Sequence, residues 1–490
     1  MENYRRNNFL SVIDSILSSI IKVFVPWLII ILGRYKNRES DFLSPGAMLA
    51  IFGTIIVAVI IYFVAKWFKN VYFISERFLV IREGVFVVKS REIPLSKIQT
   101  INISQNIKQR VLHIASLKVD TGNSSIGISE VSITVGKAEA ELLREQILRL
   151  TQNSTEANFV TEYVADSITK EKQKIYTVSN IELIKTGITS NAVFAGIAFI
   201  GSIYTFFDDI LSTFLDENIR KLENLFGGIE FNTMSVSTLT LTISAIILIF
   251  LMFSFTFSVL GTFIKYYGFS AERAGKNIII NYGLLEKKNY ILPISKIKAV
   301  YIKQNLLRQF CGLKAIYVES IGYGNEKGEE AILYPITGQI KQIDIMKNLL
   351  PEFVFEGKLI KVPKRTLGRF IISSLAVPFL LFAILSILFE YGYLSMIIVL
   401  VFLFRGILEY KNSAAGIAMN LLCMSSKAFE KTTSIIKVRD IQSTSERTNI
   451  FQRKRKIFNF EVSIQSNTFG KTIKVKNLDE ALKEEFMGLV

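Results

Sequence analysis

Long apolar stretches are the feature that most constrains this chain. A helix needs about 20 apolar residues to cross a hydrocarbon core about 30 Å thick. Half of all residues are hydrophobic and the mean hydropathy is +0.37, above the range of soluble domains. The sequence therefore predicts a multi-pass membrane protein with six spans in three hairpins. The stretches are residues 9–33, 45–68, 190–211, 237–264, 370–389 and 394–410.

The outer two stretches have an alternative. The first contains Asp14 and Lys22, so its N-terminal half also suits an amphipathic helix in the membrane interface. The sixth is short and ends in Arg405 and Glu409, whose long side chains can reach the interface. Whether these two stretches cross the membrane fully stays open.

Charges around the stretches predict their orientation. The net charge is +16, and the cations flank the ends of the stretches next to the long polar segments. Residues 208–231 carry six carboxylates against only Arg220 and Lys221. The positive-inside rule then predicts a cell-membrane protein whose six spans leave both termini and the long polar segments in the cytoplasm. Arg34, Lys36 and Arg38 are an exception to this rule, because they fall in the first outer loop. No compact basic patch indicates nucleic-acid binding.

One phrase is written twice. Residues 92–106 read EIPLSKIQTINISQN, and residues 291–305 read ILPISKIKAVYIKQN. Every identity falls at one offset of 199 residues, which pairs Pro94 with Pro293, Gln105 with Gln304 and Asn106 with Asn305. A fixed offset indicates a duplicated unit. A third, more divergent copy places Asn449 144 residues beyond Asn305.

The polar part of the unit changes its period. Residues 72–135 alternate apolar and polar residues, as strands do. Residues 137–150 instead have a helical period that places Leu142, Leu143, Ile147 and Leu150 on one apolar face. The later copies repeat this order, and the last closes with a helix for which Asn477 is the predicted N-cap. The sequence therefore predicts an α+β membrane protein in which a hairpin, several antiparallel strands and one helix occur three times.

The repeated residues resemble a known family. The stretch REIPLSKIQTINISQNIKQRVLHIASLKVDT and its second copy, ILPISKIKAVYIKQNLLRQFCGLKAIYVES, resemble the bacterial pleckstrin-homology-like (PH-like) domain of multi-pass membrane proteins. The three-unit order is similar to the YdbT type over nearly the whole chain. The resemblance implies a bent antiparallel sheet capped by a C-terminal helix and a smaller one-domain membrane partner. Some relatives look like immunity factors against membrane-active peptides.

These observations divide the chain into eight segments. Residues 1–68, 190–264 and 370–410 are the three transmembrane hairpins, the second with the acidic outer loop. Residues 69–150, 265–352 and 411–490 are the three PH-like domains. Residues 151–189 form a linker, and residues 353–369 form a basic linker beside the membrane.

The sequence gives no sign of an enzyme. His113 is the one histidine, and Cys311 and Cys423 lie far apart, so neither histidine-based catalysis nor a CxxC metal site is indicated. Walker, GxSxG and HExxH motifs are absent from the sequence. We therefore expect a protein without catalytic residues, metal or cofactor.

Two sets of residues are candidate contacts, each with a plainer structural explanation. The repeated phrase either presents Lys97, Lys296 and its glutamines to a ligand or only sets strand starts and turns. The basic run 358–370 either binds anionic headgroups or only fixes topology. The candidate membrane-surface contacts are Lys97, Lys296, Lys361, Lys364, Arg365 and Arg369, and the repeat signature is Pro94, Gln105, Asn106, Pro293, Gln304, Asn305 and Asn449.

The acidic outer loop is the third candidate. Residues 216–228 fit a short amphipathic helix on the outer membrane surface, where nearby carboxylates could meet a cationic peptide; the plainer alternative is an inert loop. The residues are Asp208, Asp209, Asp216, Glu217, Glu223 and Phe226.

Three functions follow as hypotheses. The first is immunity or resistance to a membrane-active antimicrobial peptide, such as a bacteriocin. The second is a lipid-binding membrane scaffold that acts with a one-domain partner or by self-association. The third is a transporter component, which the lack of ionisable groups in the middle of the stretches disfavours. The expected partners are membrane lipids, a cationic peptide and the one-domain partner.

Overall fold

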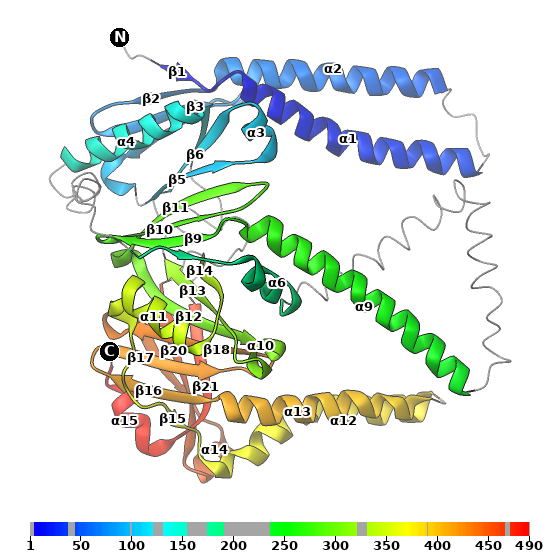
Figure 1. Cartoon of the computed structure of the whole chain (residues 1–490), viewed down its shortest axis with the longest axis vertical. Helices are drawn as coiled ribbons and strands as arrows, with labels where there is room; N and C mark the ends of the chain where they lie inside the picture. Colours follow the sequence, from blue (N-terminus) through cyan, green and yellow to red (C-terminus); the bar gives the residue numbers. More distant parts are fainter. Residues whose placement is uncertain are drawn as a thin grey trace.

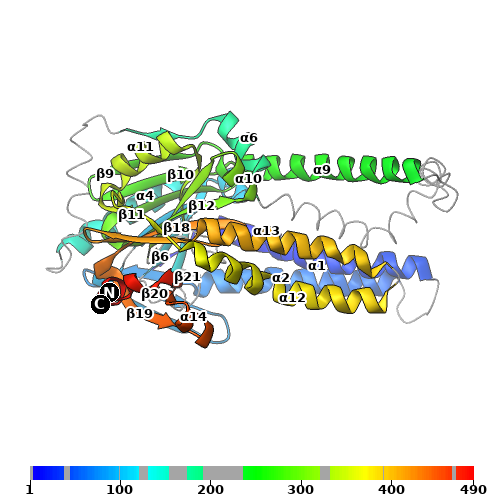
Figure 2. The ribbon, with the colours of Figure 1, turned by 90° about the horizontal axis from the view of Figure 1, so that it is seen from below.

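The computed structural model describes residues 4–37, 45–98, 100–120, 131–153, 174–190, 236–320, 331–389, 391–465 and 471–489. Long helices project from one side of a stack of antiparallel sheets (Figures 1 and 2). Except for Ser190, the predicted third span lies outside the described residues, and so does the whole acidic loop.

In the part of the chain that the structure describes, five long helices project from the sheets, and four of them make up all or most of a segment with the length and composition of a membrane span. The five helices are α1 (Leu10–Asn37), α2 (Pro45–Lys69), α9 (Val236–Tyr266), α12 (Leu367–Leu388) and α13 (Met396–Asn412). Among the described residues, four segments are long and apolar enough to cross a membrane: Ala50–Lys69, Leu248–Tyr266, Lys364–Leu388 and Gly392–Asn412. In the described part of α1, the apolar segment is the shorter Leu10–Ile20. These helices support a membrane location, and the full count of six spans stays a prediction.

Among the described residues, four antiparallel sheets form the other half of the molecule. In spatial order, sheet A contains β1 (Arg5–Arg6), β2 (Val71–Ile74), β3 (Phe78–Glu83) and β4 (Lys89–Pro94). Sheet B contains β7 (Val131–Gly136), β6 (Ile114–Asp120), β5 (Thr100–Gln105), β11 (Lys287–Pro293), β10 (Asn277–Tyr282), β9 (Ser270–Ala274) and β8 (Tyr176–Thr177). Sheet C contains β14 (Ala331–Thr337), β13 (Lys314–Ser320), β12 (Ile297–Asn305), β18 (Glu430–Lys437), β17 (Leu421–Ser426), β16 (Ala414–Ala418) and β15 (Ile360–Lys361). Sheet D contains β19 (Ile441–Arg447), β20 (Ile457–Ile464) and β21 (Lys471–Asp479).

Sheets B and C are each shared by two units. The last strands of the first unit join the first strands of the second through β5 and β11, with Gln105 opposite Lys287. The second and third units join through β12 and β18, with Gln304 opposite Lys431. The sequence predicts one bent sheet per unit, but each unit instead contributes to two sheets. The reason is that strand pairing between units is a long-range property that the local period of a strand does not determine.

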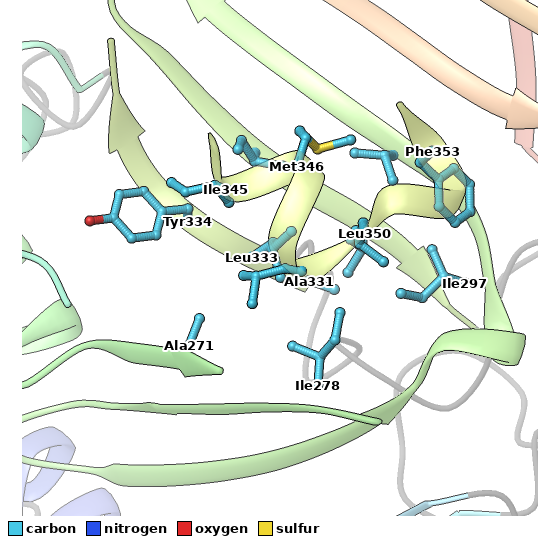
Figure 3. Close-up of a cluster of buried hydrophobic side chains, with 14 of the residues drawn as sticks. Ala271, Ile278, Ile297, Ala331, Leu333, Tyr334, Ile345, Met346, Leu350 and Phe353 are labelled. Atoms are coloured by element: carbon cyan, nitrogen blue, oxygen red, sulfur yellow. The ribbon is translucent and has the colours of Figure 1, made fainter. Parts of the chain in front are cut away.

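Three apolar cores lie between successive sheets. The first joins sheets A and B, the second joins B and C, and the third joins C and D. Each core also takes side chains from one closing helix: α4 (Lys137–Asn153), α11 (Gln339–Leu349) or α15 (Lys483–Met487). Figure 3 shows Ile345 and Met346 of α11 packed against the strands of the second core.

Two local predictions about the closing helices are wrong. Leu142 is exposed while Leu143 and Ile147 are buried, because the face of α4 that meets the sheets is narrower than the predicted one. Asn477 is not an N-cap: β21 continues through it to Asp479, whose carboxylate accepts a hydrogen bond from the backbone of Ala481 and starts the last helical turn.

The three units also share their turns. Gly84 and Gly283 have positive φ angles of 119° and 109°, and the corresponding residue of the third unit, Lys427, has φ of 72°. A second turn places His113, Gly312 and Lys456 at positive φ. These residues keep the offsets of 199 and 144. The third unit therefore retains the backbone turns of the others although its glycines are replaced.

Candidate functional site

A cavity of about 480 Å³ lies between sheets C and D, beside the end of α13. Strands β12 and β18 form one wall, β21 forms the opposite wall, and the turn between β17 and β18 closes one end. The lining residues are Tyr301, Lys303, Arg405, Glu409, Ser413, Ser426, Lys427, Ala428, Phe429, Glu430, Thr432, Ser434, Lys471, Thr472, Ile473, Lys474 and Lys476.

Alternation along β21 explains two of the basic residues of its wall. Ile473 and Val475 point into the third core, so Lys474 and Lys476 belong to the opposite, polar face of the strand. On the facing wall, Thr432 and Ser434 of β18 are buried hydroxyl residues. The cavity is therefore lined by donors from two sheets.

Cations outnumber carboxylates in this lining. Glu409 lies between two of them, with its Oε1 2.8 Å from Lys476 Nζ and its Oε2 3.8 Å from a guanidinium nitrogen of Arg405. Glu430 is the other carboxylate of the lining. Six basic residues, Lys303, Arg405, Lys427, Lys471, Lys474 and Lys476, line the same space. Lys474 pairs with Glu461 of β20, outside the lining, and the positive excess that remains favours an anionic ligand.

Aromatic rings lie beneath two of these ammonium groups. Lys471 Nζ is 4.0 Å from the centre of the Tyr301 ring, and Lys303 Nζ is 5.1 Å from that of Tyr317. Lys471 also forms an ion pair of 3.0 Å with Glu319. Cation–π contacts of this kind hold an ammonium group in place over an apolar wall.

Positive charge also gathers on the face of β18 that is turned away from the cavity. Burial lowers the pKa of Lys431, which follows Glu430 on β18, and the charge of Lys361 lowers it further. Burial likewise lowers the pKa of Lys314, and Lys431 adds to that effect.

The position of the cavity relates it to the membrane. Arg405 and Glu409 belong to the segment Gly392–Asn412, which is apolar and long enough to span. The remaining lining residues follow this segment or come from the sheets. The cavity thus lies where a membrane helix meets the sheet stack. Among the residues that the structure describes, no three histidine, cysteine, aspartate or glutamate side chains are grouped as metal ligands.

The six predicted membrane-surface cations do not line this cavity. Lys97 ends the helical turn Leu95–Lys97, and Lys296 ends the corresponding turn Ile294–Lys296 of the second unit. Lys361 is in β15, and Lys364 and Arg365 are in the turn Lys364–Thr366. Arg365 binds Asp479 at 2.9 Å, and Arg369 lies in the first turn of α12. These residues come from all three units, and the structure does not gather them in one site.

The repeat signature holds turns and short helices in place. Nε2 of Gln105 donates to the Ile114 carbonyl at 2.7 Å, and Nε2 of Gln304 donates to that of Leu313 at 2.9 Å. Pro94 and Pro293 immediately precede the two helical turns. The asparagines Asn106, Asn305 and Asn449 cap the short helices α3 (Ile107–Val111), α10 (Leu306–Phe310) and α14 (Ile450–Lys454). The six candidates of the outer loop lie outside the described residues.

Comparison with known proteins identifies the class. The bacterial PH domain family matches residues 18–151 and 223–342, which together exceed half of the chain. The chain therefore belongs to the bacterial PH domain family, as a membrane protein of the YdbT type. It is 25% identical over 482 residues to the UPF0699 transmembrane protein YdbT of Bacillus subtilis (strain 168), an alignment that covers 96% of this chain and 94% of that protein. No solved structure matches the chain.

Proposed function

We propose that this protein is a non-enzymatic membrane scaffold that binds an anionic lipid headgroup in the cavity between sheets C and D. The observation that supports this most is the lining of six basic residues beside the end of a membrane helix. A headgroup phosphate accepts hydrogen bonds from several ammonium and hydroxyl groups at once. The acyl chains of such a lipid would lie along the apolar hairpin of α12 and α13.

Neutralising two lysines of β21 tests the proposal. We expect Lys471→Gln combined with Lys474→Gln to weaken binding of dihexanoyl phosphatidylglycerol at least about tenfold, because a charge-assisted hydrogen bond contributes ~1.5 kcal/mol or more. Binding is measured by calorimetry on the detergent-solubilised full chain, with dihexanoyl phosphatidylcholine as the zwitterionic comparison.

A matched control separates a site from net charge. Lys287→Gln combined with Lys347→Gln removes two charges from exposed positions outside the cavity. This variant should bind like the parent. Equal weakening in both double variants would mean that the lipid responds to overall charge, and the proposed headgroup site would be abandoned.

We also propose that both termini and the PH-like units of this scaffold lie in the cytoplasm. Cysteine labelling tests this orientation, because burial raises the pKa of Cys423 to about 12 and keeps that thiol unreactive. Replacing Cys311 by serine and Met419, which is 89% exposed, by cysteine leaves one reactive thiol on the sheets. We expect a membrane-impermeant maleimide to label it in inverted vesicles and not in intact cells. Labelling of intact cells would reverse the orientation.

The proposed one-domain partner would pair with β19. This strand and β4 are the two ends of the series of sheets, and each pairs on only one side among the described strands. If β4 of a second copy paired with β19 in the register of the two internal junctions, its Lys89 would lie opposite Arg447. Like charges directly opposite are unfavourable, so a strand of a different chain suits β19 better than a second copy.

Protection against a cationic antimicrobial peptide is the second proposed function. It is supported by the excess of carboxylates in residues 208–231. Growth inhibition is measured in a sensitive host that expresses the chain alone or with the one-domain partner. A selective rise in the inhibitory concentration, lost on charge reversal at Asp216, Glu217 and Glu223, supports protection. No rise for any peptide, with the protein present in the membrane, removes it.

A further inference from the structure

The short helix of each unit exposes large apolar side chains. Val111 of α3, Phe310 of α10 and Phe451 of α14 are between 72% and 74% exposed. Each has a second exposed apolar residue on the same helix, namely Ile107, Leu307 and Ile450. The side chains that face the sheets are polar: Gln109, Arg308 and Gln452 are buried. These helices therefore have an inverted pattern, with polar residues inward and apolar residues outward.

A turn in each unit repeats this feature. The turn between β3 and β4 exposes Phe86, Val87 and Val88, and the corresponding turn between β10 and β11 exposes Leu284 and Leu285. In the third unit Phe429 occupies the position of Phe86 and Leu285, where it is partly exposed. Exposed apolar groups at corresponding places in three divergent units indicate a common environment.

The short helices contact the beginnings of the hairpins. Nζ of Lys108, on α3, is 2.9 Å from Oγ of Ser18 on α1. Nε of Arg308, on α10, is 3.1 Å from Oγ1 of Thr189, which precedes the predicted third span. Beyond α14, the Lys456 carbonyl accepts from Arg365 at 3.3 Å, where the segment Lys364–Leu388 begins.

The turns contact the other ends of the hairpins. In the first unit the Gly84 amide donates to Oδ1 of Asn70 at 3.2 Å, one residue beyond α2. In the second unit the Leu284 amide donates to the Ile264 carbonyl of α9 at 2.9 Å. In the third, Nδ2 of Asn412, at the end of α13, donates to the Lys427 carbonyl at 3.0 Å. Helix and turn therefore flank the base of each hairpin, on the side of the sheets from which the long helices project (Figure 1).

Charge next to these apolar groups fits a membrane surface. The helix α14 and the residues after it contain Arg453, Lys454, Arg455 and Lys456, and α3 carries Lys108 and Arg110. Apolar side chains flanked by cations are typical of segments that lie in the interface of an anionic leaflet.

We infer that each PH-like unit inserts two apolar elements into the lipid interface. One is its short helix, and the other is the turn that follows Gly84, Gly283 or Lys427. The lipid surface is then a direct partner of the units, and contact with it does not depend on the headgroup cavity. Six such elements would hold the sheet stack at a fixed tilt over the bilayer. This explains the outward apolar residues of α3, α10 and α14, because exposing their side chains to water is unfavourable.

Accessibility of a spin label tests this inference. The full chain carries Cys311→Ser and one further cysteine at Val111, Phe310 or Phe451, and is reconstituted into nanodiscs that hold a single chain and contain phosphatidylglycerol and phosphatidylcholine. Met419→Cys is the matched control, because Met419 is also apolar and largely exposed but follows β16, a full strand length away from the end of α13.

Collision rates with oxygen and with a water-soluble nickel chelate give the result. We expect the oxygen-to-nickel ratio to be several-fold higher at the three helix sites than at Met419. Ratios equal to that of Met419 would place the helices in water and overturn the inference. Low collision rates with both reagents would mean that protein covers the sites, which overturns it as well. If the calorimetric test showed no headgroup binding in the cavity, the expected collision rates would stay the same.

Discussion

Replacing Gly283 by alanine should destabilise the chain by about 3 kcal/mol, because two unfavourable effects of about 1–3 kcal/mol each coincide there. The residue has φ of 109°, which side chains with a Cβ rarely adopt. A Cβ at this position would also lie 1.9 Å from the backbone oxygen of Glu286.

The surroundings of Gly283 prevent the turn from adjusting. Its amide donates to the Tyr267 carbonyl at 2.9 Å, which ties the turn to the end of α9. The turn leads into β11, whose first residues pair with β5 of the preceding unit. A shifted turn would therefore disturb both the base of a hairpin and the junction between two units. We expect trypsin to cleave the variant faster near this junction.

Gly312→Ala is the matched control. Gly312 also has a positive φ, 66°, but a Cβ there meets no atom within 4 Å. We expect it to cost only about 1 kcal/mol, the price of a left-handed residue with a side chain. The shift in the midpoint of thermal unfolding is measured in one detergent for both variants. Equal shifts would show that the contact with Glu286 has no effect.

The sequence predicts well those features that depend on neighbouring residues. The offset of 199 residues identifies the repeated unit, and in the first two copies the Gln-Asn pair lies at a strand end followed by a short helix. Asn449 keeps its cap although Pro293 is replaced by Lys437 in the third copy. Such features persist because a cap or a turn requires only a few residues of the right chemistry.

Features that depend on distant residues could not be predicted. The pairing of β5 with β11 and of β12 with β18 joins segments that only the folded chain brings together. For the same reason the cavity could not be predicted: KTIKVK in β21 contains three lysines, but nothing local indicates that they lie near β12 and β18. A basic strand face predicts exposure to solvent by default, and here a second sheet and a membrane helix lie opposite.

Removing the ammonium group of Lys298 should be the other large effect, a loss of about 3 kcal/mol. Lys298 of the second unit and Asp440 of the third form an ion pair of 2.6 Å, with side chains 21% and 9% exposed. Lys298 lies where the register between β12 and β13 shifts, and such bulges redirect a side chain. In Lys298→Met the buried carboxylate would lose this partner, and its Oδ2 already accepts no hydrogen bond from any described residue.

A double-mutant cycle separates the interaction energy of Lys298 with Asp440 from the effect of each residue alone. We expect Lys298→Met with Asp440→Leu to recover most of the lost stability, because two apolar residues in contact replace a buried ion pair at little cost. Lys174→Met is the matched control, since Lys174 and Asp344 also lie 2.6 Å apart but are 57% and 41% exposed. That variant should unfold at nearly the parent temperature, because water screens an exposed pair. Additive losses in the cycle would mean that Lys298 and Asp440 stabilise the chain separately, so that this ion pair does not help to join the second and third units.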